Sequence, residues 1–129
     1  MDRAKLRTVL YVDDEPDIRQ VVELALGLVD GLTVHTCDSG ERALEKLPEL
    51  KPDLVLLDVM MPGTDGPTTL GRMRANPALA SIPVVFMTAK AMPQEVARFR
   101  QLGSAGVIAK PFDPMGLPGE VDGLMRGTG

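Results

Sequence analysis

Short apolar runs alternate along the chain with longer segments in which apolar residues recur at helical spacing. We expect five short runs to be strands, and all but the second are mostly apolar: Thr8–Val12, Leu32–Thr36, Leu54–Leu57, Pro83–Met87 and Gly106–Ala109. Continuous apolar runs of this length are typical of parallel strands that are buried on both faces. The sequence therefore predicts a five-stranded parallel sheet.

The segments between these runs predict helices. Apolar residues recur every three or four positions over Pro16–Val29, Gly40–Leu47, Pro67–Arg74 and Pro93–Leu102. Ser39 and Asp65 stand where N-cap residues belong, and prolines stand at first helical positions. A fifth helix is expected over Asp113–Arg126. Because each interior glycine costs about 1 kcal/mol relative to alanine, we expect this helix to be short or frayed and to begin near Pro118.

Strands that alternate with helices predict βαβ units, and these units build a doubly wound α/β fold with helices on both faces of the sheet. The chain has 129 residues, which fits one domain over residues 1–129. We find no repeat and no linker-like segment. Aromatic residues make up only 3% of the chain, so the core must be aliphatic, with eight methionines available to fill it.

The overall charge and the lack of certain segments exclude several classes of function. The net charge of −4 argues against a DNA-binding surface, which requires a clustered basic face. Cys37 is the only cysteine, so no internal disulfide is possible. No apolar run approaches the roughly 18 residues of a membrane span, and no signal peptide is evident. We expect a soluble cytoplasmic protein.

Three acidic residues stand at the carboxyl ends of predicted strands, where ligands gather in folds of this class. Asp13 and Asp14 follow the first strand, and Asp58 follows the third. If the strand order is 2-1-3-4-5, the first and third strands are neighbours and the three carboxylates converge. Oxygen ligands of this kind suit Mg²⁺.

Two further strand ends add complementary chemistry. Thr88 ends the fourth strand with a hydroxyl group, and Lys110 ends the fifth with an ammonium group that can bind phosphate as a point charge. Acids, a metal, a hydroxyl and a lysine together describe a phosphoryl-transfer site, in which positioning and charge neutralisation do most of the catalysis.

Four motifs resemble the receiver domain of two-component response regulators, of the stand-alone, chemotaxis-regulator-like type. They occur in the family's order and span Thr8 to Asp113: YVDDE at 11–15, LLDVMMPGTDG at 56–66, FMTAK at 86–90 and AKPFDP at 109–114. The resemblance implies a flavodoxin-like fold. It also implies a phosphorylation-dependent signalling switch, which catalyses only its own phosphorylation and dephosphorylation.

The resemblance assigns a role to each candidate residue. Asp58 would accept a phosphoryl group from a histidine kinase or a histidine phosphotransfer protein. Asp13, Asp14 and Asp58 would bind Mg²⁺ together with the backbone carbonyl of Met60. Thr88 and Lys110 would contact the phosphoryl oxygens, and the peptide bond from Lys110 to Pro111 would be cis.

The sequence departs from the family at one switch position and has an apolar residue beside the acceptor. Val107 stands where the family usually has an aromatic residue, so we hypothesise activation without the burial of a ring. Met60 and Lys90 should lie at the mouth of the site. Because Met60 cannot orient a water molecule, we predict slow self-dephosphorylation.

Other interpretations stay open at this point. Asp58 could be a helix cap or loop acid, Asp13 and Asp14 could cap the helix that begins at Pro16, and Lys110 and Thr88 could be ordinary surface and strand-end residues. His35 on an edge strand and a buried Cys37 are expected to be structural.

We expect a stand-alone receiver without an output domain, a monomer or weak phosphorylation-dependent dimer that contacts a downstream protein target, with no direct contact to nucleic acid or membrane. The alternative is a docking module that works without phosphorylation. A small phosphatase with an Asp nucleophile is disfavoured, because such enzymes have a second Asp where this chain has Met60.

Overall fold

Five parallel strands form a single sheet in the order β2-β1-β3-β4-β5, as predicted. The computed structural model describes residues 7–128. Helices follow the strands in strict alternation along the chain: β1 (Thr8–Val12), α1 (Pro16–Gly27), β2 (Thr33–Cys37), α2 (Gly40–Leu50), β3 (Leu54–Asp58), α3 (Gly66–Ala75), β4 (Val84–Thr88), α4 (Pro93–Gln101), β5 (Gly106–Ala109) and α5 (Leu117–Thr128).

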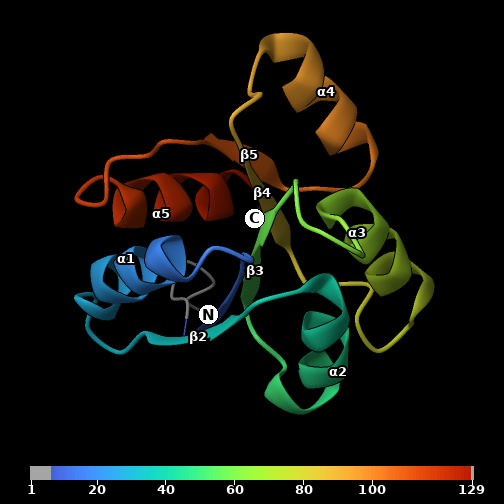
Figure 1. Cartoon of the computed structure of the whole chain (residues 1–129), viewed down its shortest axis with the longest axis horizontal. Coiled ribbons are helices and arrows are strands. Elements are labelled where there is room, and N and C mark those ends of the chain that lie inside the picture. Colours follow the sequence, from blue (N-terminus) through green and yellow to red (C-terminus); the bar gives the residue numbers. More distant parts are fainter. Residues whose placement is uncertain (1–6, 129) are drawn as a thin grey trace.

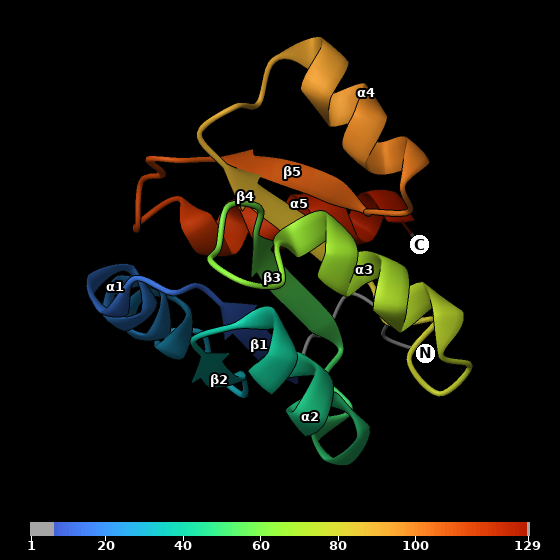
Figure 2. The ribbon, with the colours of Figure 1, turned by 45° about the vertical axis from the view of Figure 1, so that its right-hand side comes forward.

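The helices cover both faces of the sheet (Figures 1 and 2). Helices α2, α3 and α4 pack against one face, in a core that includes Leu10, Leu57 and Phe86 from the strands. Helices α1 and α5 pack against the other face, in a core that includes Tyr11 and Leu56. Neighbouring residues of β1, β3 and β4 thus enter opposite cores, which explains why these strands are almost continuously apolar, whereas the edge strand β2 is partly exposed.

Local signals place the helix ends within a few residues of where the structure has them. The Ser39 hydroxyl accepts a hydrogen bond from the backbone N–H of Arg42, and the Asp65 carboxylate accepts one from that of Thr68. Both residues are therefore N-caps, as predicted. Helix α2 runs one turn past its predicted end, through Pro48 to Leu50, and Lys51 closes it in the left-handed conformation with φ 46°.

The prediction of a short last helix is wrong. Helix α5 has 12 residues, as many as α1, although it begins at Leu117, close to the predicted start. Leu117 and Val121 are buried against the sheet, whereas Gly119 and Gly123 have no neighbouring side chain or backbone within 4 Å of where a Cβ would lie. The glycines lie on the open face, so burial of the apolar face outweighs their low helix propensity.

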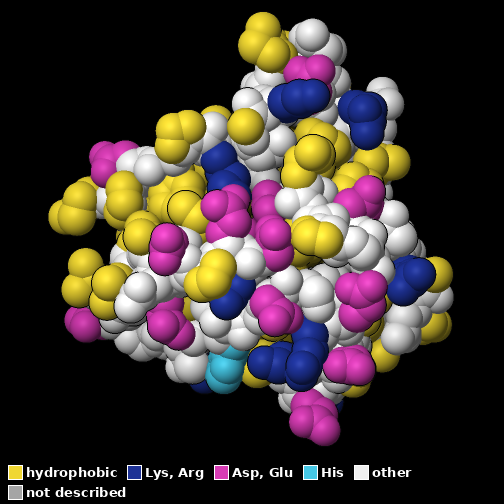
Figure 3. All heavy atoms as spheres, viewed as in Figure 1, with side chains coloured by type: hydrophobic (Ala, Val, Ile, Leu, Met, Phe, Trp, Pro, Cys, Tyr) yellow, Lys and Arg dark blue, Asp and Glu magenta, His cyan; other side chains and the backbone are white. Residues whose placement is uncertain are grey.

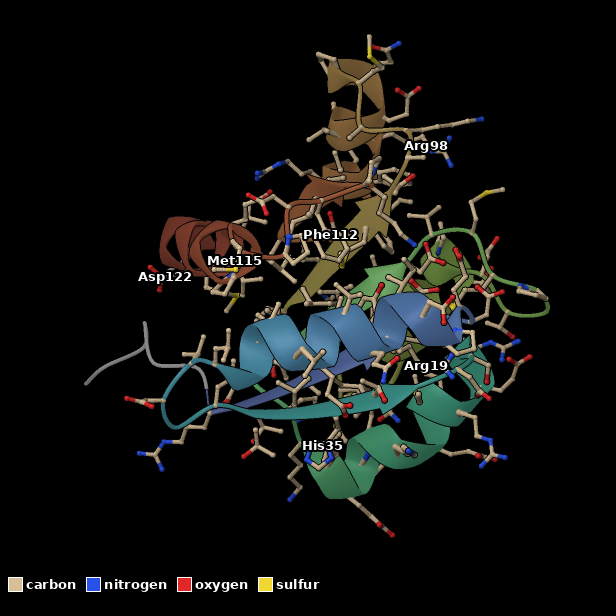
Figure 4. All side chains as sticks on the ribbon, turned by 60° about the vertical axis from the view of Figure 1, so that its left-hand side comes forward. Arg19, His35, Arg98, Phe112, Met115 and Asp122 are labelled. Carbon is tan, nitrogen blue, oxygen red and sulfur yellow. The ribbon has the colours of Figure 1, made fainter. Side chains whose placement is uncertain are left out.

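His35 and Cys37 lie where the sequence predicts. His35 is exposed on β2, which is an edge strand (Figure 4). Cys37 is a buried free thiol. None of the helices within residues 7–128 has the length and apolar character needed to span a membrane.

Candidate functional site

The candidate site lies at the carboxyl end of the sheet, where the strand order brings β1 and β3 side by side. Asp13 directly follows β1, and Asp58 is the last residue of β3. The carboxylates of Asp13, Asp14 and Asp58 each have an oxygen atom that lies within 4.8 Å of an oxygen of the other two. Figure 3 shows acidic side chains near the middle of the face where Figure 1 has the end of β3, with a basic side chain beside them.

Lys110 approaches these acids from the end of β5, an outer strand. Its backbone N–H donates to the Thr88 carbonyl at 2.8 Å, which anchors the residue to β4. Its Nζ lies 3.0 Å from Asp13 Oδ2, 3.5 Å from Asp58 Oδ1 and 4.0 Å from Glu15 Oε1. With only 15% of its side chain exposed, Lys110 forms a largely desolvated link between the two buried acids. The peptide bond that follows it is cis, as predicted.

Asp13 is fully buried, and its carboxylate accepts hydrogen bonds from three donors. Oδ2 accepts from the Tyr11 hydroxyl as well as from Lys110, and Oδ1 accepts from the backbone N–H of Glu15 at 2.9 Å. The Arg19 guanidinium donates to the Asp13 carbonyl at 2.7 Å, from the N-terminal part of α1 (Figure 4). These donors offset the cost of removing the carboxylate from water.

Asp14 and Asp58 bring oxygen atoms that the protein itself leaves open. Within residues 7–128, the Asp14 carboxylate makes no hydrogen bond or ion pair, and the Asp58 carboxylate has a single such partner, Lys110. Glu15 is the N-cap of α1 without a side-chain cap bond, so neither Asp13 nor Asp14 caps that helix. Three acids face one lysine, and this excess of negative charge fits a hard divalent cation such as Mg²⁺.

Burial and neighbouring charges shift the pKa values of the two central groups. Burial, and next the negative charge of Asp13, raise the pKa of Asp58 to about 6, although Lys110 counteracts part of this rise. For Lys110, burial alone lowers the pKa, but the hydrogen bond to Asp13 and the charges of Asp13, Asp58 and Glu15 outweigh it. The pKa of Lys110 is therefore raised. At neutral pH the lysine is cationic and most of the Asp58 carboxyl is ionised.

Asp58 opens onto a cleft of about 350 Å³, which Thr88, Lys110 and Met60 also line. Thr88 is the last residue of β4 and is buried, and its hydroxyl oxygen accepts a hydrogen bond from the backbone N–H of Lys90 at 3.0 Å. The Met60 side chain is 75% exposed at the mouth of the cleft, whereas the Lys90 side chain is exposed but does not line it. The structure thus brings together the acids, the hydroxyl and the lysine that the motifs predict.

Sequence reasoning missed three residues that shape this site. Tyr11 precedes Asp13 by two positions, so strand periodicity alone could have placed both side chains on one face. Gly66 begins α3, and a Cβ atom there would lie 2.6 Å from the Asp58 carbonyl oxygen, so a glycine lets α3 approach the end of β3. For Arg19 we see no sequence signal, because its contact depends on how α1 lies against β1.

This fold and this arrangement of acids and lysine define the class of protein. Residues 9–122 match the response regulator receiver domain, and the chain belongs to this family. The phosphate regulon transcriptional regulatory protein PhoB of Pseudomonas aeruginosa is 32% identical over 123 residues, which cover 95% of this chain and 53% of PhoB. The chain spans about half the length of PhoB and of the other transcriptional regulators it matches.

Solved structures agree with this assignment over nearly their whole length. A putative response regulator from Chloroflexus aurantiacus has a TM-score of 0.83 and 32% identity, covering 95% of this chain and 99% of that one. The chemotaxis response regulator CheY4 of Vibrio cholerae has a TM-score of 0.85 and 28% identity, covering 93% and 99%. Receiver domains of two-component systems are generally phosphorylation-dependent signalling switches and do not act on separate substrates.

Proposed function

We propose that Asp58 accepts a phosphoryl group from a phosphohistidine on a histidine kinase or a histidine phosphotransfer protein. One observation carries this proposal: the ammonium group of Lys110 lies between Asp13 and Asp58 in a group of three carboxylates that the protein only partly neutralises. A buried acid at the end of an apolar strand is costly for folding, and a role as nucleophile accounts for it.

In the proposed step, an Asp58 carboxylate oxygen attacks the phosphorus atom and forms the acyl phosphate bond. The phosphorus–nitrogen bond breaks, and its electron pair passes to the imidazole ring, which takes a proton from solvent. Lys110 is already within 3.5 Å of Asp58 and would pair with the transferred oxygens. The Thr88 hydroxyl lines the same cleft and would donate to another of them.

Asp13, Asp14, Asp58 and the backbone carbonyl of Met60 would hold Mg²⁺. When bound, the ion would neutralise charge that builds up between the carboxylates and the incoming phosphoryl oxygens. Asp14 would contribute most readily, because its carboxylate has no hydrogen-bond or ion-pair partner in the described part of the chain. Asp13 would first have to loosen its bond to Lys110.

Phosphorylation would then change contacts with a downstream protein. The Thr88 hydroxyl would turn from the Lys90 backbone toward the phosphoryl group, which would move the loop that leads into α4. The residues just before α4 are largely exposed, so this movement would be felt at the surface. We propose that this domain acts through protein contacts, as a monomer or a weak phosphorylation-dependent dimer, without binding nucleic acid itself.

The test is phosphorylation by small donors, followed by intact mass spectrometry. We expect acetyl phosphate, and phosphoramidate as a donor with a phosphorus–nitrogen bond, to add one phosphoryl group to the wild type in the presence of Mg²⁺. Asp58→Asn and an excess of EDTA should each abolish the adduct. Asp17→Asn removes an exposed acid on α1 that lies outside the cleft, and it should be phosphorylated like the wild type.

An adduct that persists in Asp58→Asn would contradict the assignment of the acceptor. A wild type that folds and binds Mg²⁺ but gains no adduct from either donor would favour a docking module that works without phosphorylation.

A further inference from the structure

Tyr11 makes a contact for which the proposed chemistry has no role. It is the only tyrosine of a chain that has no tryptophan. Its ring is fully buried between the sheet and the helices α1 and α5, and its hydroxyl donates a hydrogen bond to Asp13 Oδ2. A valine or leucine would fill the same core position without a hydroxyl. The hydroxyl group therefore calls for an explanation beyond packing.

The two side-chain donors to Asp13 Oδ2 are held very differently. Tyr11 lies within β1 and is paired through the backbone with both β2 and β3, so the core fixes the position of its hydroxyl. Lys110 lies beyond the end of β5, is partly exposed, and divides its ammonium group among Asp13, Asp58 and Glu15. A lysine that turns toward a phosphoryl group leaves Asp13, whereas the tyrosine stays.

We propose that Tyr11 is a positioning residue that holds the Asp13 carboxylate in the orientation in which it binds Mg²⁺, both in the free domain and after Lys110 has turned to the phosphoryl group. This inference rests on the proposed function and extends it to a residue of the core. The Glu15 backbone N–H fixes Oδ1 and Tyr11 fixes Oδ2, so the plane of the carboxylate is defined without the lysine. Donors of this kind orient metal ligands in many proteins.

The first test removes the hydroxyl and retains the ring. We expect Tyr11→Phe to bind Mg²⁺ about tenfold more weakly than the wild type in isothermal titration calorimetry, because loss of such a donor typically costs ten- to a hundredfold in metal affinity. Val9→Ala is the matched control, since it cuts back another buried residue of β1 in the same core and leaves the hydroxyl contact intact. Its affinity should equal that of the wild type.

The second test uses the emission of Tyr11 and leaves the tyrosine in place. A carboxylate that accepts a hydrogen bond from a phenol quenches its fluorescence, because it takes up the proton in the excited state. Mg²⁺ draws charge from the carboxylate, so titration with Mg²⁺ should raise the emission of the wild type. Asp13→Asn should emit more strongly without Mg²⁺ and should not respond to it.

Equal Mg²⁺ affinity of Tyr11→Phe and wild type would overturn this inference, and so would a wild type whose emission ignores an ion that calorimetry shows to bind. If the wild type still gains its phosphoryl adduct in those cases, the proposed function stands. A wild type that binds no Mg²⁺ and gains no adduct would overturn both.

Discussion

The two halves of the site are held in different ways. In the acidic half, on β1 and β3, Asp13 accepts three hydrogen bonds, and α3 packs against the end of β3 through Gly66. In the switch half, on β4 and β5, the Thr88 hydroxyl has a single backbone donor, from Lys90 in the loop before α4. Val107, at the position of the family's usual aromatic residue, is only partly buried.

This difference matches two different physical tasks. Like charges in a buried cluster repel one another, so Asp13, the most buried of the acids, needs fixed partners that keep it in place. A segment that moves on phosphorylation must come from a part of the structure with few contacts and low local stability. Changes to the buried contacts of the acidic half should therefore act mainly on stability, whereas changes at the exposed mouth of the cleft and in the switch half should act on rates and movement.

The largest effect should come from Asp58→Asn in the metal-free domain. Because burial and the Asp13 charge raise the pKa of Asp58 from 3.8 to about 6 on folding, the folded state favours the protonated form. The stability contributed by this group is fully present below pH 3.8 and lost as the pH rises through 6. The shift corresponds to about 3 kcal/mol. In urea unfolding with EDTA, the variant should be more stable by about 3 kcal/mol at pH 7 and by less than about 1 kcal/mol at pH 4.

Asp65→Ala is the control for Asp58→Asn, because its effect on the free energy of unfolding should have the opposite sign. The hydrogen bonds from Thr68 lower the pKa of Asp65, so its contribution is present above its unfolded pKa and is lost toward acid pH. Loss of this cap should destabilise the domain by about 1 kcal/mol at pH 7.

Equal stability of wild type and Asp58→Asn at pH 7 would show that the buried charge carries no cost.

Gly66→Ala should destabilise the domain by about 2 kcal/mol, as overpacking does elsewhere. The added Cβ would lie 2.6 Å from the Asp58 carbonyl oxygen and 2.9 Å from the Val59 Cα, and both are backbone atoms that cannot turn aside. Gly71→Ala in the same helix meets no atom within 4 Å and should stabilise it by up to about 1 kcal/mol. Thermal unfolding of both variants separates the two cases. A neutral Gly66→Ala would mean that α3 moves away without cost.

Met60→Asn should shorten the lifetime of the phosphorylated domain. The exposed Met60 side chain lines the cleft beside Asp58 but cannot orient a water molecule, whereas an amide can. We expect loss of the phosphoryl group to be roughly tenfold faster, which is less than a positioned general base provides. Intact mass against time measures this rate. Met115→Asn, at an exposed methionine outside the cleft, should leave it unchanged, and an unchanged rate in both variants would refute the role of Met60.

The smallest expected effect is a movement of the switch half when a phosphoryl mimic binds. Crystals of the free domain and of the domain with Mg²⁺ and beryllofluoride, a phosphoryl mimic, should differ in the loop from Thr88 to Met92 and in α4. Because position 107 is a valine, no ring becomes buried there. Helix α2 and the Gly66 contact serve as internal references that should not move. A loop that stays in place with the mimic bound would rule out this form of switching.

Local features of the fold follow from the sequence because their causes are local. Apolar periodicity marks the strands and helices, and the side chains of Ser39 and Asp65 bond to backbone groups three residues away. The same holds for the chemistry of the site: acids, threonine and lysine at strand ends are visible in the sequence. The strand order, in contrast, does not follow from periodicity, which does not say which parallel strands are neighbours.

Only the tertiary structure decided how these groups meet. Glycine content predicts a weak last helix, yet α5 completes three turns because Leu117 and Val121 are buried against the sheet. The choice of Asp13 and Asp58 as partners of Lys110, and the raised pKa of Asp58, depend on desolvation and on charges far away in the sequence. The sequence by itself thus determined which elements form and which reactive groups they carry. Packing decided the distances, burial and partners of those groups, because these depend on residues that approach one another only in the folded chain.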